Sequence, residues 1–553
     1  MRTTTKNLKN HWTRRVAAAA FVSSLMALAG GNAMAQCTEL VSGLLRPIGI
    51  TQSKKDNLLV SESGTATPNT GRISIVDLAG TRRTLVSGLP SGISFEANAP
   101  SGSTGLFLRG RTLYLAVGVG DAVMAGPGQG LTAANPNPSS PLFSSILAFH
   151  FSAAVEKNTQ GFTLTLANQE TLASGQPVTL SNGGGDTITI EMIVNFPNFT
   201  PDPRPSFAGN VTNTNPFALV ALGDRLYVTD GGQNLVWSVD LSARQFSVLT
   251  RFPTNIPNPL FNLNPPPPSV GGPFLEPVPT GIEFADGHLL VTLFRGFPFP
   301  AGTSTVQRVD PLTGSQSAFI GGLKTAIDIL PIRADDEQGG ASKYLLLQYA
   351  SGPFVAPPGL LLRFDTPAGP PTTVASCLTA PTGMTLDQKT GILYLPELSG
   401  RIVSISVGAE AQDAETGLAP TVRNIAARGR VESGENVLIG GFIIGEGTGG
   451  GAIKVVVRAI GPSLSSKGIA GPLQDPVLTL HDANGVEIAR NDNWKGDAGQ
   501  TSQQAEIEGI GLAPASEAES ALVAALAPGN YTGIVRGKVG NAGVALVEVY
   551  HVQ

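Results

Sequence analysis

Apolar residues in this chain come in short runs, many of which alternate with polar residues, and turn-forming residues separate one run from the next. Alternation with a period of two residues predicts β-strands, and few stretches carry the 3.6-residue period of an amphipathic helix. The sequence contains 67 glycines and 42 prolines, the residues that tight turns require. The pattern therefore predicts an all-β protein.

The runs repeat as a unit of four strands. In the first unit "RPIGI" leads to "LLVSESG" (58–64), "GRISIVDL" (71–78) and "RRTLVSGL" (82–89). Six such units, each a four-stranded sheet, predict a six-bladed β-propeller over residues 36–407. The long stretch "PSGSTGLFLRGRTLYLAVGVGD" (100–121) then supplies the first two strands of the second unit. Second strands of the later units are "LYVTDGG" (226–232), "LLVTLFRG" (289–296), "LLLQYASG" (345–352) and "LYLPELSG" (393–400).

The last unit lacks an outer strand after "RIVSISV" (401–407), whereas the chain near its beginning carries a spare one. "CTELVSGL" (37–44) resembles the outer strands "RTLVSGL" and "TVASCL". We expect this N-terminal segment to complete the sixth blade, which would leave no open sheet edge between the first and last blades. Deletion of residues 36–44 should then abolish folding.

Cys37 and Cys377 are the two cysteines of the chain. A pair of cysteines in an exported protein favours a disulfide. The repeat argues against one: aligning Pro47 with Pro381 places Cys377 opposite Gly43, six residues beyond Cys37. Six residues of strand span about 20 Å, whereas bridged Cα atoms lie within about 7 Å. The alignment therefore predicts two unbonded cysteines, with the bridge as the alternative.

The first 35 residues have the layout of a secretory signal peptide. A basic segment precedes the apolar run "VAAAAFVSSLMALAG", and "AMA" before Gln36 is a small-residue cleavage site. We therefore expect a periplasmic or extracellular protein. Without the leader's five basic residues, 31 Lys and Arg face 41 Asp and Glu. This acidic balance argues against nucleic acid as a partner, and no later apolar run is long enough to span a membrane.

A second domain is predicted after a linker over residues 408–420. Residues 421–553 contain roughly eight further strands, which predict a β-sandwich or jelly roll. Within it "DANGVEIARNDNW" (482–494) offers oxygen ligands for calcium. It lacks the terminal Glu of a twelve-residue calcium loop, and "ANG" between alternating strands equally predicts a hairpin turn. The calcium ligands would be Asp482, Asn484, Asp492 and Asn493.

Acidic residues at the ends of the second strands are the strongest candidates for chemistry. Glu62, Asp230 and Glu397 close that strand in three blades, and Asp121 lies shortly after it in another. If they converge at the channel mouth, their oxygen ligands favour calcium. Alternatively, each accepts backbone hydrogen bonds in its own tight turn. By the same count Tyr349 closes the strand of the fifth blade. No His is placed for a Ser-His-Asp set.

Long connections decorate the same face of the predicted propeller. Their Phe and Pro content predicts either an apolar groove over the channel or stiff loops that only pack on one another. The segment 161–194 should extend the second blade by a hairpin. The long connections are 122–142, 255–281, 294–303 and 352–359.

Residues 81–124, together with the series of blades, resemble the ScyD/ScyE family of exported bacterial proteins. The resemblance covers about residues 37–407, and "PSGSTGLFLRGRTLYLAVGVGD" is its most specific part. It implies an exported propeller, and some relatives are encoded with the biosynthesis of scytonemin, an indole-phenol pigment. It brings no catalytic residues. "RAIGPSL" and "GNYTGIVRGKVGNAGVALVEVY" resemble C-terminal modules of other exported bacterial proteins, which implies attachment, sorting or protein contact.

Two functions follow as hypotheses. The first is a non-catalytic binding or scaffold protein, with a small molecule or a cell-envelope protein as its partner and no required cofactor. The second is a metal-dependent hydrolase or lactonase acting through Glu62, Asp121, Asp230 and Glu397, with calcium as the ion. They differ in metal dependence.

Overall fold

In the computed structural model the chain forms two compact units, which divide chiefly between Gln412 and Asp413. Each unit is described by itself. The predicted signal peptide and most of the predicted linker lie outside the described residues. No helix in the described part of the chain is long and apolar enough to cross a membrane. The described residues are 34–128, 130–261, 263, 272–333, 343–407, 412–413, 424–432, 436–444, 453–496, 502–527 and 529–552.

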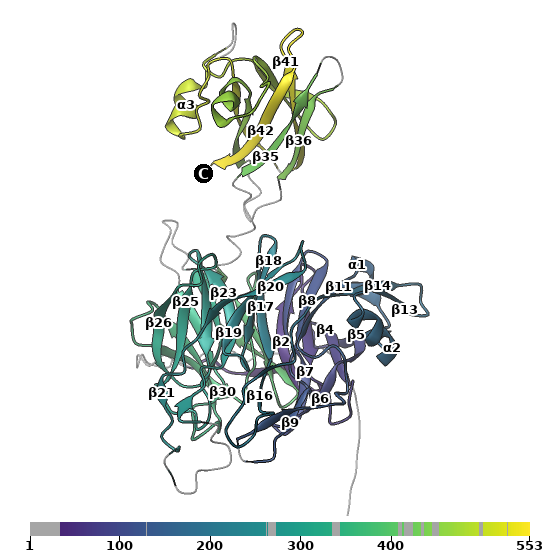
Figure 1. Ribbon diagram of the computed structural model, residues 1–553, viewed down its shortest axis with the longest axis vertical. Coiled ribbons are helices and arrows are strands. Elements are labelled where there is room, and N and C mark those ends of the chain that lie inside the picture. Colours follow the sequence, from purple (N-terminus) through teal and green to yellow (C-terminus); the bar gives the residue numbers. More distant parts are fainter. Residues whose placement is uncertain are drawn as a thin grey trace, which may run out of the picture. The chain divides into compact units, whose positions relative to one another are not determined.

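Six sheets of mainly antiparallel strands make up the first unit, and they follow one another along the chain (Figure 1). We number them blades 1 to 6, and this is the predicted β-propeller architecture. From the inner to the outer strand, blade 1 contains β2 (Pro47–Gln52), β3 (Asn57–Glu62), β4 (Gly71–Asp77) and β5 (Arg82–Leu89); blade 2 contains β7 (Ala99–Arg109), β8 (Thr112–Val117), β11 (Ser145–His150) and β14 (Thr187–Asn195); blade 3 contains β17 (Pro216–Leu222), β18 (Arg225–Asp230), β19 (Leu235–Asp240) and β20 (Gln245–Arg251).

The remaining blades repeat the same order. Blade 4 contains β23 (Pro279–Ala285), β24 (His288–Leu293), β25 (Ser304–Val309) and β26 (Gln316–Leu323); blade 5 contains β27 (Ala326–Arg333), β28 (Lys343–Gln348), β29 (Gly359–Phe364) and β30 (Thr372–Leu378), with β34 (Gln412–Asp413) beside β27; blade 6 contains β31 (Thr385–Asp387), β32 (Ile392–Glu397), β33 (Arg401–Ser406) and β1 (Thr38–Val41).

Side-chain hydrogen bonds join every blade to the next around the ring. Most of them come from a Ser or Thr that donates to a backbone carbonyl of the following inner strand, so each seam satisfies a buried polar group. The sixth bond runs from the last blade back to the first and shows that the ring is closed. In chain order the bonds are Ser61 Oγ to Thr104 O, Thr104 Oγ1 to Pro216 O (2.9 Å), Thr229 Oγ1 to Thr280 O, Thr280 Oγ1 to Ala326 O (3.2 Å), Met384 N to Asp328 Oδ2 (3.0 Å) and Thr382 Oγ1 to Ile48 O (2.9 Å).

The N-terminal strand completes blade 6, as the repeat predicts. β1 is antiparallel to β33, with Thr38 opposite Ser404 and Glu39 opposite Val403. The first and last parts of the propeller sequence therefore share one sheet, and β33 is not left as an edge strand.

The prediction that the two cysteines are unbonded is wrong. Cys37 and Cys377 form a disulfide, and their Cα atoms are 6.0 Å apart. The alignment measured their separation along equivalent strands, but Cys37 precedes β1 and does not belong to the repeat. Instead the chain before β1 lies along β30 of the neighbouring blade, where Ala35 N donates to Val374 O over 2.8 Å. The bridge thus ties the ring-closing strand to blade 5.

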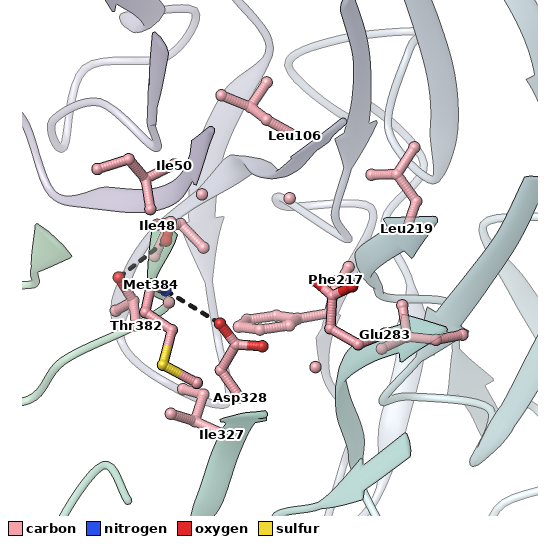
Figure 2. Close-up of a pocket in the computed structure, with 16 residues that line it drawn as sticks. Ile48, Ile50, Leu106, Phe217, Leu219, Glu283, Ile327, Asp328, Thr382 and Met384 are labelled. Atoms are coloured by element: carbon pink, nitrogen blue, oxygen red, sulfur yellow. Dashed lines mark hydrogen bonds between the residues drawn. The ribbon is translucent and has the colours of Figure 1, made fainter. Parts of the chain in front are cut away.

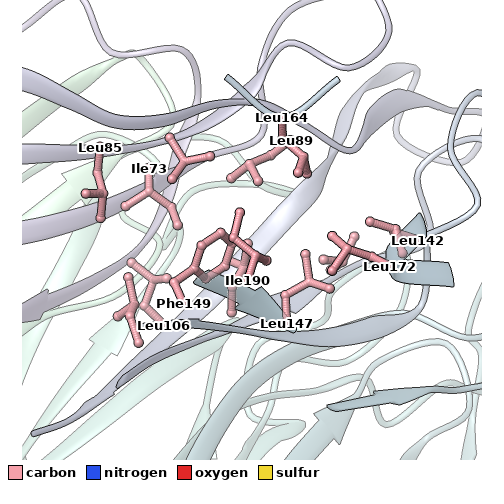
Figure 3. Close-up of a cluster of buried hydrophobic side chains, with 14 of the residues drawn as sticks. Ile73, Leu85, Leu89, Leu106, Leu142, Leu147, Phe149, Leu164, Leu172 and Ile190 are labelled. Carbon is pink, nitrogen blue, oxygen red and sulfur yellow. The ribbon is translucent and has the colours of Figure 1, made fainter. Parts of the chain in front are cut away.

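Hydrophobic burial explains why these sequences form strands with both faces apolar in the middle of each blade. In β3 every residue after Asn57 is buried, because consecutive blades pack face to face and cover both sides of the sheet. The largest apolar cluster joins blades 1 and 2, where Ile73 and Leu85 meet Leu147 and Phe149 (Figure 3). Complete burial of such a side chain is worth about 1.5–3 kcal/mol.

Blade 2 carries the largest additions. β13 (Val178–Ser181) extends it by the predicted hairpin, and β6 (Ser91–Ser94) pairs with the start of β7. Residues 153–173 also form two short helices that the strand pattern did not predict. These are α1 (Ala153–Asn158) and α2 (Leu166–Ala173), with β12 (Phe162–Thr163) between them.

Three small two-stranded ribbons complete the first unit. Several of their strands are labelled, together with β6, along the lower edge of that unit in Figure 1. The pairs are β9 (Val123–Ala125) with β10 (Thr132–Ala134), β15 (Phe199–Pro201) with β16 (Val211–Asn213), and β21 (Ile256–Pro257) with β22 (Phe274–Leu275).

The second unit consists of two four-stranded sheets that share one apolar core, as a β-sandwich does. Val457 from one sheet and Leu480 from the other are both fully buried in it. The first sheet is β35 (Asn424–Val431), β42 (Gly543–Val552), β37 (Ile453–Ile460) and β40 (Ser520–Leu526); the second is β36 (Leu438–Ile444), β41 (Gly529–Gly537), β38 (Pro476–His481) and β39 (Glu487–Asn491); η2 (Pro462–Lys467) and α3 (Gln504–Gly509) connect strands.

Candidate functional site

The two glutamates predicted as metal ligands each pair with an arginine of their own blade. Glu62 is fully buried, and its Oε1 lies 2.7 Å from Arg72 Nε. Glu397 is also fully buried and forms an ion pair with Arg401. Each also accepts a backbone N–H from the connection into its inner strand; for Glu397 this donor is Thr379 N, at 2.7 Å. These contacts use the carboxylates within the blade.

The two predicted aspartate ligands are likewise occupied by hydrogen bonds within their own blades. Asp230 is fully buried, and burial raises its pKa although several N–H groups donate to it. Asp121 Oδ1 accepts Ser139 N at 2.9 Å. The donors to Asp230 are Asn215 N at 2.8 Å, Gly232 N at 3.1 Å, Gln233 N at 3.0 Å and Trp237 Nε1 at 2.8 Å.

The structure does not bring these four acids together around one point. In the part of the chain that the structure describes, no three His, Cys, Asp or Glu side chains are grouped to hold a metal ion. Asp230 accepts Gly232 N and Gln233 N in the turn after its strand, as the alternative of the sequence analysis predicts. The other three acids accept hydrogen bonds from more distant segments of their own blades. Asp482 behaves as Asp230 does: its Oδ1 accepts Asn484 N and Val486 N, both at 2.9 Å, in the hairpin between β38 and β39.

A recurring backbone hydrogen bond identifies the equivalent position in each of the six blades. In each blade the residue just after the second strand donates its N–H to a carbonyl near the start of the inner strand. The pairs are Ser63 with Arg46, Gly118 with Gly102, Gly231 with Asn215, Phe294 with Val278, Tyr349 with Thr325, and Leu398 with Ala380, at 2.7–3.1 Å.

This pattern corrects the sequence count for blade 5. β28 ends at Gln348, so Gln348 is the equivalent of Glu62, and Tyr349 is the equivalent of Ser63 and Phe294. Successive strand residues point to opposite sides, so a shift of one residue moves the side chain from the blade to the mouth. The acids close the strand, and the residues that follow them are the ones available to a ligand.

Several of these residues line a pocket of about 270 Å³ at the mouth of the channel, which we call the mouth pocket. Its volume is near the lower end of the range of ~300–1,000 Å³ that small-molecule sites occupy. Side chains from all six blades contribute to it. Among them are Arg46 and Ser63 of blade 1, Glu96 of blade 2, Phe217 of blade 3, Phe294 of blade 4, Tyr349 of blade 5 and Leu398 of blade 6.

One wall of the mouth pocket is aromatic and held in place by ring contacts. The ring of Phe294 lies edge-on to Tyr349, with centroids 5.6 Å apart, and edge-on to Phe299 at 5.7 Å. Beyond them Phe297 stacks on Phe354, with centroids 5.5 Å apart. The Phe- and Pro-rich loop 294–303 therefore supplies Phe294 to the pocket. Phe297 of the same loop instead packs on Phe354 of the loop 352–359.

The ionisable groups of the mouth pocket are Arg46, Tyr349 and Glu96. Burial lowers the pKa of Arg46 and raises that of Tyr349, and each acts electrostatically on the other. Burial also raises the pKa of Glu96, on the turn between β6 and β7. Arg46 keeps its charge at neutral pH because an arginine is not deprotonated in proteins, and Tyr349 remains a neutral hydroxyl donor.

Below the mouth pocket the channel narrows to a cavity of about 70 Å³, shown in Figure 2. Five of the six inner strands place Gly or Ala here, because neighbouring strands approach closely: a Cβ on Gly49 would lie 2.6 Å from Thr104 O. Blade 5 instead places Asp328. The small residues are Gly49, Gly105, Ala218, Gly281 and Gly383.

The Asp328 carboxylate projects into this narrow part, beside the ring of Phe217 (Figure 2). Gly281 leaves room for it, since a Cβ there would lie 2.6 Å from Asp328 Oδ1. Oδ1 accepts Ile329 N, and Oδ2 accepts Met384 N of the next blade, both at 3.0 Å. Burial outweighs these bonds and raises the pKa of Asp328 to about 7.

No family model matches the chain, and no curated protein matches it. Solved structures resemble it at low identity. A putative phosphatase from Bacteroides thetaiotaomicron is 10% identical, with 66% of this chain and 72% of that chain covered and a TM-score of 0.37. A gluconolactonase from Xanthomonas campestris (11% identity, 67% and 89% covered, TM-score 0.35) and an aldose sugar dehydrogenase from Streptomyces coelicolor (13% identity, 67% and 97% covered, TM-score 0.35) are further examples. These likenesses carry no argument about chemistry.

Proposed function

We propose that this protein is an exported, non-catalytic binding protein of the ScyD/ScyE type, whose propeller holds a small organic molecule in the mouth pocket. The observation that carries the proposal is the pocket itself: a concave site at one end of the channel, with a preorganised aromatic wall and three ionisable groups. Such sites are the usual form of small-molecule binding in proteins.

The chemistry of the wall supports a ligand with a flat apolar part. Phe217, Phe294 and Tyr349 present rings from three blades, and Leu398 and Val278 add aliphatic surface. Aromatic contacts of this kind contribute about 0.5–1.5 kcal/mol each beyond the area they bury. The resemblance to the ScyD/ScyE family makes an aromatic pigment precursor one ligand of this type.

The disulfide supports export. Bonded cysteines persist in oxidising compartments such as the periplasm and the extracellular space, and they are rare in the reducing cytosol. We therefore propose a periplasmic or extracellular location, consistent with the signal peptide expected over residues 1–35. For the second unit we propose attachment or sorting.

The metal-dependent alternative draws no support from the four acids. Glu62 and Glu397 are neutralised by arginines, and Asp230 is occupied by four donors. A metal would have to displace these bonds in separate blades at once.

N-phenyl-1-naphthylamine, a neutral probe that fluoresces in apolar sites, tests the proposal. We expect the mature protein to bind about one probe per chain. Phe294→Ser should weaken binding by about tenfold, because burying an aromatic ring is worth about 1.5–3 kcal/mol. The control Phe246→Ser removes a comparably partly exposed ring from the outer strand β20 and should leave binding unchanged. Equal losses in both variants, or no binding by the wild type, would contradict the proposal.

A further inference from the structure

Arg46 differs from the propeller arginines that bind carboxylates, and from Arg308, whose guanidinium lies over the Phe319 ring. Arg46 lines the mouth pocket and is half-buried, yet it forms no ion pair or side-chain hydrogen bond within the described residues. Arg72, Arg111 and Arg401, by contrast, each pair with a buried glutamate. Removing a cation from water without a partner is costly, so a half-buried, unpaired guanidinium needs an explanation.

The backbone conformation of Arg46 does not explain why an arginine occupies this position. Its φ is +58°, a left-handed conformation, but Val278, Thr325 and Ala380 at the equivalent positions of blades 4, 5 and 6 have φ of +52°, +44° and +50°. The conformation belongs to the connection that enters the inner strand. The loop therefore determines the backbone conformation at this position, whereas the side chain varies between blades. Because Val, Thr and Ala occupy the equivalent positions, the left-handed backbone does not require a cation there.

The neighbours of Arg46 do not neutralise it either. The ionisable group that acts on it is Tyr349, which is neutral at pH 7. Burial raises the pKa of Glu96, and its carboxylate accepts a hydrogen bond from the Asn213 amide at 3.4 Å.

We infer that the ligand of the mouth pocket is an organic anion with an aromatic body, and that its carboxylate or sulfonate group binds the Arg46 guanidinium with the Tyr349 hydroxyl as a second donor. This inference rests on the proposed binding function. The guanidinium fork suits a planar carboxylate, and charge-assisted bonds are about twice as strong as neutral ones. Phe294, in ring contact with Tyr349, places apolar surface next to the two donors.

Two probes with the same ring system test the inference. 1-Anilinonaphthalene-8-sulfonate carries an anionic group, and N-phenyl-1-naphthylamine has the same skeleton without it. We expect the wild type to bind the sulfonate more tightly. Arg46→Gln should weaken sulfonate binding by about tenfold and change binding of the neutral probe little, whereas Arg46→Lys should recover part of the preference. Tyr349→Phe should cause a smaller loss. Arg536→Gln, which removes an exposed arginine from the second unit, is the control for surface binding.

The outcomes separate the two proposals. If Arg46→Gln leaves the ratio of the two affinities unchanged while both probes still depend on Phe294, the anion inference is wrong and the binding pocket stands. If neither probe binds the wild type, the binding function itself fails, and the inference fails with it. A loss of sulfonate binding equal in Arg46→Gln and Arg536→Gln would also overturn the inference, because binding would then follow surface charge.

Discussion

Asp328 should make the propeller less stable as the pH rises from about 4 to about 7. In the unfolded chain an Asp ionises near pH 3.9, whereas burial in the channel raises the pKa of Asp328 to about 7 in the folded protein. The folded state therefore holds a proton that the unfolded state has released over this interval. A carboxyl group whose pKa is higher in the folded protein than in the unfolded chain stabilises the folded state. This stabilisation is complete below the unfolded pKa and is lost as the pH rises through the folded pKa.

The magnitude follows from the size of the shift. About three pKa units at 1.36 kcal/mol each amount to about 4 kcal/mol, of which about 3 kcal/mol falls between pH 5 and pH 8. This is an upper bound because the carboxylate faces the channel and retains partial exposure to water. In a unit of this size about 3 kcal/mol corresponds to about 5 °C in melting temperature.

Thermal denaturation of wild type and Asp328→Asn at pH 5 and pH 8 measures the effect. The amide cannot titrate, although it leaves one of the two N–H donors without an acceptor, so the variant's stability at a single pH is not the readout. The difference between wild type and variant should shift by about 3 kcal/mol in favour of the variant on going from pH 5 to pH 8. A difference that is the same at both pH values would refute the reasoning.

Three further predictions concern the bonds that hold the ring together. The Cys377→Ser variant should lose about 2–4 kcal/mol of unfolding free energy, and its melting temperature should equal that of the reduced wild type. A melting temperature equal to that of the oxidised protein would contradict the structural role of the bridge. Asp230→Ala should cost about 3 kcal/mol or more in urea denaturation, because it leaves buried N–H donors unpaired, and elemental analysis should show unchanged metal content; loss of a bound ion would argue for a metal site. Burial alone would raise the pKa of Glu156, but Ser53, Asn57 and Arg111 lower it overall. Glu156→Gln should therefore destabilise the protein more at pH 7 than at pH 3, since this stability is present above the unfolded pKa and is lost as the pH falls toward and through the lowered folded pKa; a penalty independent of pH would rule this out.

The repeat in the sequence predicts the propeller well because each blade buries the same kind of strand. The motif "LLVSESG" recurs with its apolar core and its following turn, and the spare strand at residues 37–44 matches the gap in blade 6. Both features are local patterns that a single sequence displays. The second unit follows from strand alternation in the same way, and its hairpin at Asp482 from turn chemistry.

The candidate site could be predicted only in part, because its positions depend on register. The sequence draws attention to Glu62, Asp230 and Glu397, whereas the residues that face the mouth are the ones after them. The repeat count in the sequence places Tyr349 one position too early. A slip of one residue in register moves a side chain to the opposite side of its strand. A closer comparison of "TAIDI" with "PTGI" and "PIGI" would have singled out Asp328 as the one acid among small residues.

Other features have no local signal. The disulfide depends on where the chain runs before β1, which lies outside the repeat. Arg46 precedes Pro47 in an ordinary-looking connection, and that it has no partner among the residues the structure describes becomes visible only once the neighbouring blades are in place.

A crystal structure of the mature protein with bound 1-anilinonaphthalene-8-sulfonate tests the central claim most directly. The account predicts one probe molecule in the mouth pocket, with its rings against Phe294 and Phe217 and its sulfonate within hydrogen-bond distance of the Arg46 guanidinium. An empty mouth pocket, or a probe bound only elsewhere on the protein, would contradict it.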